Sequence, residues 1–214
     1  MNYTAQVIPA VLEKDFDEII KKIELIRPYT DIIQLDVMDG AFVPNTTFND
    51  TFKLATLDIN MELHLMIEKP AFYISKWAMA NVKRMIVHYE AASNIGHVID
   101  LIERAEKEVG VALNPETPSH VLEDHIDRID MVLIMGVHPG FSGQDFIRDV
   151  LEKIREIKKM RPGVLVAVDG GVNMRTRKSI LEAGADILSA NSAIWKADDI
   201  GQAMKVMTEG PQPQ

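Results

Sequence analysis

The chain has 214 residues, 47% of them hydrophobic, which suits one domain built around a single large core. A net charge of −9 argues against a nucleic-acid partner, and the absence of cysteine excludes disulfides and thiolate metal sites. No apolar stretch reaches the roughly 18 residues of a membrane span, and the N-terminus lacks a signal-peptide pattern. We therefore expect a cytoplasmic protein without membrane contact.

Short runs rich in β-branched residues alternate with amphipathic segments along the whole chain. The predicted strands are Gln6–Val11, Asp31–Val37, Met61–Met66, Arg84–His88, Val111–Leu113, Met131–Met135, Val164–Asp169 and Ile187–Ala190. The predicted helices are Asp15–Ile26, Asp50–Leu57, Ala71–Ala80, Ile95–Glu108, Ser119–His125, Gln144–Lys159, Arg175–Ala183 and Asp198–Met207. Eight such alternations predict parallel crossovers and, at this length, a single-domain α/β fold of the (β/α)8 TIM-barrel type. We expect one barrel domain over residues 1–209 and a disordered tail at 210–214.

Alternation within the predicted strands separates an inward face from an outward face. Gln34 and Asp36 share a face with Ile32, and Asp169 shares a face with Ala167. We expect polar side chains only on the face that looks into the barrel, close to the carboxyl ends of the strands.

Two acids end strands that are far apart in the sequence, namely Asp36 and Asp169. The carboxyl ends of parallel barrel strands meet at one mouth, so these carboxylates can serve as acid and base on opposite faces of one substrate. His64 ends a third strand on the same side and is a candidate for the same site. The alternative is that both acids cap neighbouring turns. For His88, an inward hydrogen-bonding role and simple packing fit equally well.

Methionines and glycine-bearing loops surround the predicted mouth. Met38, Met66 and Met135 fit either as filler or as a water-poor wall beside an enediolate, and the two roles are compatible. The loop from His138 to Gln144, with Gly140, Phe141, Ser142 and Gly143, has the composition of a closing lid. Gly170, Gly171, Asn191 and Ser192 follow the last two strands, where barrels commonly bind phosphate.

The chain resembles the ribulose-phosphate 3-epimerase family over essentially its whole length. The matching blocks are Leu35–Asn45 (LDVMDGAFVPN), His64–Met66, Val87–His88, Val111–Pro118, Pro139–Gln144, Val168–Gly171 and Ser192–Ile194. The resemblance implies interconversion of D-ribulose 5-phosphate and D-xylulose 5-phosphate through an enediolate, with Asp36 and Asp169 as the acid/base pair. It also implies a divalent metal held by two histidines and these two aspartates, a phosphate site at Gly170, Gly171, Asn191, Ser192 and the lid glycines, and a homo-oligomer, either dimer or hexamer.

Two departures from the family pattern concern the metal site and the charge at the mouth. Gln34 stands where the family has its first metal-binding histidine, and an amide oxygen is a poorer ligand than imidazole for zinc or iron(II). Glu13 corresponds to a substrate-binding serine and adds a third negative charge. In one hypothesis Glu13 replaces the lost ligand and favours a harder ion such as manganese. In the other, no metal binds, and Gln34 acts with a proton-sharing carboxylate.

The leading interpretation is therefore a sugar-phosphate 3-epimerase that binds a small phosphorylated sugar, with Gln34, Asp36, His64 and Asp169 as candidate metal ligands. Asn191 replaces a family glycine and, together with Glu13, reshapes the pocket. These changes leave two alternatives: an epimerase of another ketose phosphate, such as a hexulose 6-phosphate, or a catalytically lapsed barrel that binds a phosphosugar.

Overall fold

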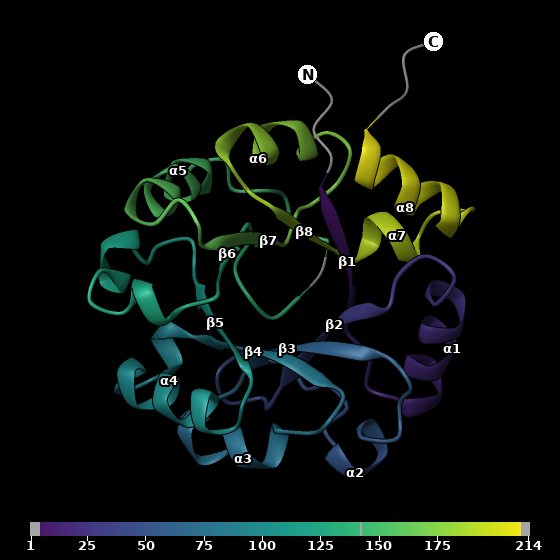
Figure 1. Ribbon diagram of the computed structural model, residues 1–214. Helices are drawn as coiled ribbons and strands as arrows, with labels where there is room; N and C mark the ends of the chain where they lie inside the picture. The colour runs from purple at the N-terminus through teal and green to yellow at the C-terminus, as the bar shows by residue number, and fades with distance from the viewer. Residues whose placement is uncertain (1–4, 142, 211–214) are drawn as a thin grey trace.

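Eight parallel strands close into a barrel in sequential order, with β8 paired to β1 (Figure 1). The computed structural model describes residues 5–141 and 143–210. The strands are β1 (Gln6–Val11), β2 (Ile32–Met38), β3 (Asn60–Met66), β4 (Val82–His88), β5 (Glu108–Leu113), β6 (Met131–Met135), β7 (Leu165–Asp169) and β8 (Ile187–Ala190). The predicted (β/α)8 barrel is confirmed.

The helices form a ring outside the barrel (Figure 1). They are α1 (Phe16–Ile26), α2 (Thr51–Leu54), α3 (Ile74–Trp77), α4 (Ile95–Arg104), α5 (Val150–Met160), α6 (Arg177–Ala183), α7 (Ser192–Trp195) and α8 (Ile200–Glu209). Four short 3-10 helices complete the connections: η1 (Pro70–Phe72), η2 (Tyr89–Ala91), η3 (Ser119–Leu122) and η4 (Ile126–Arg128). Across residues 5–141 and 143–210, no helix has the length and apolarity needed to cross a membrane.

Several predicted boundaries differ from the structure; the helix predicted at Ala71–Ala80, for example, is divided into η1 and the short α3. The helix predicted at Gln144–Lys159 begins only at Val150, because the backbone N–H of Ile147 donates to the carbonyl of Gly136 and holds the preceding residues against β6. The stretch predicted as a helix at Ser119–His125 is a 3-10 turn instead. The helix predicted to reach Glu108 ends at Arg104, and Glu108 opens β5.

The C-terminal end of the described chain is ordered through Gly210. Its backbone N–H donates to the carbonyl of Val206 at the end of α8. Residues 211–214 lie outside the described part of the chain.

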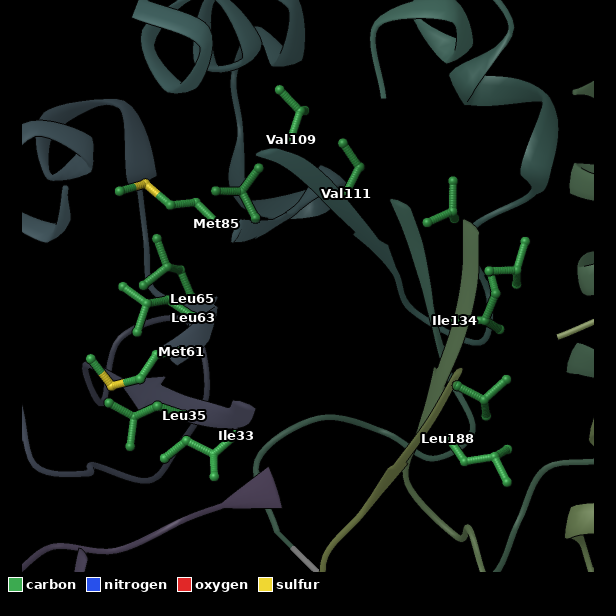
Figure 2. Packing of buried hydrophobic residues seen from close by; sticks show 14 of the residues in the cluster. Ile33, Leu35, Met61, Leu63, Leu65, Met85, Val109, Val111, Ile134 and Leu188 are labelled. Atoms are coloured by element: carbon green, nitrogen blue, oxygen red, sulfur yellow. The ribbon is translucent and has the colours of Figure 1, made fainter. Parts of the chain in front are cut away.

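Side chains that alternate along the strands form two separate hydrophobic clusters. Outward-facing residues such as Ile33, Leu35, Val166 and Val168 pack against the helices, and Figure 2 shows several of them pointing away from the barrel axis. The barrel interior holds a second cluster of Ile8, Ile32, Ile86, Ala112, Met131, Leu133, Met135, Ala167 and Ile187. The predicted division between inward and outward positions is confirmed for β2 and β7.

The N-terminal end of the barrel interior contains a charged cluster that contradicts one prediction. Arg84 donates from one Nη to Glu62 Oε2 at 2.7 Å and from the other to Glu108 Oε2 at 2.6 Å. Burial raises the pKa of Glu62 to about 7, although the Arg84 charge opposes the rise. Inward polar residues therefore occur at both ends of the strands and not only at the carboxyl ends. The guanidinium makes this possible because it lies between the two acids.

Candidate active site

The two predicted acids and the predicted histidine meet at the carboxyl ends of three strands. Asp36 lies in β2, His64 lies beside it in β3, and Asp169 ends β7. One ligand atom from each residue lies within 4.8 Å of the others, and all three residues are buried. Their convergence follows from the inward positions that the strand alternation predicts.

Gln34 lies below these acids and acts as a hydrogen-bond donor to both. Its Nε2 is 2.9 Å from Asp36 Oδ1 and 2.7 Å from Asp169 Oδ2. Its Oε1 accepts from the hydroxyl of Ser189 at 2.7 Å. This orientation matches every donor with an acceptor. The amide oxygen thus faces Ser189 and not the acids, so the structure does not place Gln34 as the oxygen ligand that we predicted.

His64 balances the negative charge of the two acids. Its Nδ1 is 3.0 Å from Asp36 Oδ1 and 3.3 Å from Asp169 Oδ2. Burial alone lowers the pKa of His64, but hydrogen bonds to Asp169 and Asp36 outweigh it and raise the pKa to about 9. Burial and the charge of Asp169 raise the pKa of Asp36. The His64 imidazole therefore holds its second proton more tightly than an isolated imidazole does, beside both carboxylates.

A second histidine extends this cluster away from the cavity. His88 Nε2 is 2.8 Å from His64 Nε2, and His88 Nδ1 is 3.4 Å from Glu90 Oε2. Burial lowers the pKa of His88 to about 4, which keeps its ring neutral. Of the two interpretations of His88, the structure supports the hydrogen-bonding one. Sequence reasoning missed Glu90, although it lies only two residues after His88.

A cavity above the cluster is bordered by most of the predicted substrate-binding residues. Predicted residues along its lining are Asp36, Met38, His64, Met66, Met135, Gly140, Phe141, Gly143, Asp169, Gly170, Gly171, Asn191 and Ser192. The lining also includes residues that the sequence analysis did not assign to the site, namely Leu12, Val137, His138, Pro139, Val172 and Ser189. Ser142, also predicted, lies outside the described residues. Met38 and Met66 pack with Leu12, Phe42 and Val43 and form an apolar wall on one side.

The loop after β7 lies directly against the loop after β6. Gly170 has a φ of +91°, and a Cβ there would lie 2.4 Å from the Val137 side chain, so only glycine fits. The backbone N–H of Gly136 donates to the carbonyl of Asp169. These contacts fix the main chain that carries Asp169 at the edge of the cavity.

Glu13 lies elsewhere than predicted. Its Oε1 is 2.6 Å from Lys22 Nζ on α1, and Glu13 is not among the residues that border the cavity. Its charge is therefore neutralised by a lysine, and the structure does not support Glu13 as a replacement ligand or substrate contact. Asn191 has a φ of −105°, so it does not use a left-handed backbone, and its side chain donates to the carbonyl of Ala10.

The barrel and this cluster together define a class of protein: a (β/α)8 barrel with ionisable side chains gathered at the carboxyl ends of its strands, where enzymes of this fold have their active sites. The sequence model described as the ribulose-phosphate 3-epimerase family matches residues 6–195. The chain belongs to this family of sugar-phosphate epimerases, which are isomerases.

Named relatives agree with this assignment over most of their length. The chain is 41% identical to ribulose-phosphate 3-epimerase of Bacillus subtilis (strain 168), covering 93% of this chain and 96% of the relative. It is 38% identical to the enzyme of the same name from Aquifex aeolicus (strain VF5), covering 90% of each.

Solved structures with similar folds have much lower sequence identity. A 3-hexulose-6-phosphate synthase from Salmonella typhimurium has a TM-score of 0.72 at 17% identity, covering 96% of this chain and 97% of that one. A 3-keto-L-gulonate-6-phosphate decarboxylase from Vibrio cholerae has a TM-score of 0.72 at 11% identity, covering 99% and 100%. At these identities the likeness concerns the fold alone.

Proposed function

We propose that this chain interconverts D-ribulose 5-phosphate and D-xylulose 5-phosphate by moving a proton at C3. The hydrogen on C3 is acidic because the carbon is next to the C2 carbonyl. The observation that carries the proposal is the pair of buried carboxylates, Asp36 and Asp169, held at one cavity by a shared amide. The names of the family and of the relatives give the substrate.

In this mechanism one aspartate removes the C3 proton from one face and the other returns a proton to the opposite face. The raised pKa of Asp36 suits a group that holds a proton between turnovers. The Gln34 Nε2 hydrogens keep both carboxylates in place, since each accepts from the same nitrogen. His64 offsets the negative charge that grows when the enediolate forms.

The donor set of Asp36, His64 and Asp169 fits a divalent metal. Two carboxylate oxygens and one imidazole nitrogen, all within 4.8 Å, are ligands that zinc, iron(II) and manganese accept. We propose that these three residues hold such an ion, with Gln34 as a hydrogen-bonding support. When bound, the metal stabilises the negative oxygens of the enediolate.

The phosphate group of the substrate is proposed to bind beside the loops after β7 and β8. Gly170, Gly171, Asn191 and Ser192 border the same cavity as the acids, and backbone amides at such loops bind anions in barrel enzymes. The lid residues Gly140, Phe141 and Gly143 border the cavity from the other side and exclude water. The wall of Met38, Met66 and Met135 is proposed to surround the sugar carbons.

The test is turnover of D-ribulose 5-phosphate by the purified chain, followed in a coupled assay for D-xylulose 5-phosphate. A parallel panel of ketohexose 6-phosphates measures preference. We expect the pentulose to have the highest kcat/KM, and Asp169→Asn to reduce it strongly. No turnover of any ketose phosphate by metal-loaded protein would reject the proposal, and a preference for a hexulose 6-phosphate would change its substrate.

The expected homo-oligomer and the cytoplasmic location stay predictions. Light scattering of the purified chain tests the first, with a dimer or hexamer as the expected result.

A further inference from the structure

A buried polar chain leads away from the catalytic acids to the turn after β4. It consists of His64, His88 and Glu90, joined by one nitrogen–nitrogen contact of 2.8 Å and one nitrogen–oxygen contact of 3.4 Å. Both imidazole side chains are completely buried, whereas the Glu90 side chain, in η2, is 22% exposed. The proposed mechanism uses His64 but gives no role to the other two residues.

The direction of the hydrogen bonds follows from what Glu90 can accept. As a carboxylate it has no hydrogen to donate. Its Oε1 accepts from the backbone N–H of Asn114 at 2.8 Å and from the hydroxyl of Thr117. Its Oε2 faces His88 Nδ1, so that nitrogen carries a hydrogen. With that hydrogen on Nδ1, the lone pair of the His88 ring lies on Nε2, 2.8 Å from His64 Nε2, and accepts a hydrogen from it.

The surroundings keep both rings in this arrangement. The rings of His64 and His88 stack with centroids 5.0 Å apart, and Phe42 covers His88 at 4.8 Å. Lys153 on α5 donates to the carbonyls of Asn114 and Pro115, which secures the loop that holds Glu90. The ring orientation therefore depends on packing as well as on the hydrogen bonds.

We propose that Glu90 and His88 are positioning residues that keep a hydrogen on His64 Nε2, so that His64 Nδ1 is the nitrogen presented to Asp36, Asp169 and a metal ion. A metal can bind Nδ1 only through its lone pair, so it has to displace the hydrogen that Nδ1 donates to the aspartates, while the hydrogen on Nε2 stays in place. This inference deepens the proposed function and rests on it for the purpose of the site. The positions of the hydrogens along His64, His88 and Glu90 can be measured whether or not the protein has the proposed activity.

Glu90→Gln is the decisive variant because it keeps the shape and reverses the polarity. The amide oxygen is expected to stay with its two donors, Asn114 N–H and the Thr117 hydroxyl, so the NH2 group faces His88 Nδ1. His88 is then expected to carry its hydrogen on Nε2 and to donate to His64. His64 in turn loses the Nε2 hydrogen and keeps one on Nδ1, which blocks metal binding there.

The experiment records nitrogen NMR spectra of metal-free, full-length protein labelled with ¹⁵N at histidine, and titrates zinc or manganese by calorimetry. Wild type should carry hydrogen on His88 Nδ1 and His64 Nε2, and Glu90→Gln should carry it on His88 Nε2 instead. Metal affinity should fall about 10–100-fold in the variant, as for other lost outer-sphere partners. The kcat of the metal-loaded enzyme should fall with little change in KM.

Thr117→Val is the matched control, because it removes a donor to Glu90 but leaves the carboxylate that faces His88. It should keep the wild-type hydrogen positions and metal affinity. His88→Phe retains a ring against Phe42 but removes the acceptor for His64, and its metal affinity should fall as in Glu90→Gln.

Unchanged hydrogen positions in Glu90→Gln would overturn the inference, and so would equal losses of metal affinity in Glu90→Gln and Thr117→Val. Should Glu90→Gln not fold, wild-type metal affinity in His88→Phe would overturn it. Lack of epimerase activity in wild type would reject the proposed function, while the spectra and the metal titration would still decide this inference.

Discussion

The two ends of the barrel interior both hold a pair of acids, but the groups between the acids differ. At the N-terminal end a guanidinium, that of Arg84, lies between Glu62 and Glu108. At the C-terminal end the neutral amide of Gln34 lies between Asp36 and Asp169. A permanent cation lies between the first pair of acids, whereas a neutral hydrogen-bond donor lies between the second pair.

This difference separates a structural cluster from a reactive one. At the N-terminal end, Arg84 offsets the charge of its two acids, and removing this cation is expected mainly to lower stability. At the C-terminal end, the two acids contact an amide and an imidazole, and we propose that they serve as the acid and the base of the reaction. Burial of an acid alone therefore does not identify an active site in this barrel, but the partner of the acid does.

The largest expected effect is on turnover at the C-terminal end. Asp36→Asn and Asp169→Asn should each lower kcat by about 10²–10⁴-fold, because each removes a group that transfers a proton. Circular dichroism should show the barrel intact. Wild-type turnover in either variant would show that this aspartate does not transfer a proton in the reaction.

Arg84→Met should have the largest effect on stability. It leaves the buried Glu62 without its cation, whereas Glu108 keeps Lys83 Nζ at 3.5 Å. We expect a loss of about 3–5 kcal/mol in the free energy of unfolding at pH 8. Urea unfolding measures the loss, which should be smaller at pH 5, where Glu62 is protonated. The folded variant should keep wild-type kcat. A lowered kcat with unchanged stability would mean that the N-terminal cluster contributes to catalysis and not to stability.

Glu62→Gln sharpens the comparison through pH. The folded-state pKa of Glu62 lies near 7, above its usual 4.5, so the folded protein holds this proton more tightly than the unfolded chain. Stability from this group is therefore lost as pH rises from 4.5 through 7. Wild type should match Glu62→Gln at pH 5 and be less stable at pH 8, by on the order of 2 kcal/mol. If the stabilities of wild type and Glu62→Gln changed with pH in the same way, burial would not raise the pKa of Glu62.

Ser189→Ala should have the smallest effect. It removes the hydroxyl that orients the Gln34 amide, a neutral hydrogen bond worth about 1 kcal/mol. We expect kcat to fall by less than roughly tenfold, in line with that energy, and no change in the fold. Steady-state kinetics measure this, with Ser179→Ala on α6 as a surface control. A loss as large as that of Asp169→Asn would assign Ser189 a direct part in the reaction.

Much of the fold could be predicted because the pattern of the strands depends on local sequence. The bounds of β1, β6 and β8 match the prediction, since each is a short apolar run between clear helical segments. The start of β5 was missed because Glu108 resembles a helix residue. It becomes part of a strand only through its pairing with Arg84 on β4.

The candidate site could be predicted in part for the same reason. Asp36, His64 and Asp169 follow from strand ends and alternation, whereas Ser189 becomes relevant only through the register that places it beside Asp169. The contact of Glu90 with His88 could not be predicted, because it depends on the shape of the turn after β4. The position of Glu13 was predicted wrongly because nothing in its neighbouring sequence shows that Lys22, on the next helix, comes within 2.6 Å.

Hydrogen exchange at C3 in D₂O, recorded by proton NMR separately from each sugar phosphate, tests the two-aspartate account most directly. Asp169→Asn should exchange the C3 hydrogen of one sugar without converting it, and Asp36→Asn should do the same only with the other sugar. Exchange of the same sugar by both variants, or conversion by either at the wild-type rate, would contradict the account.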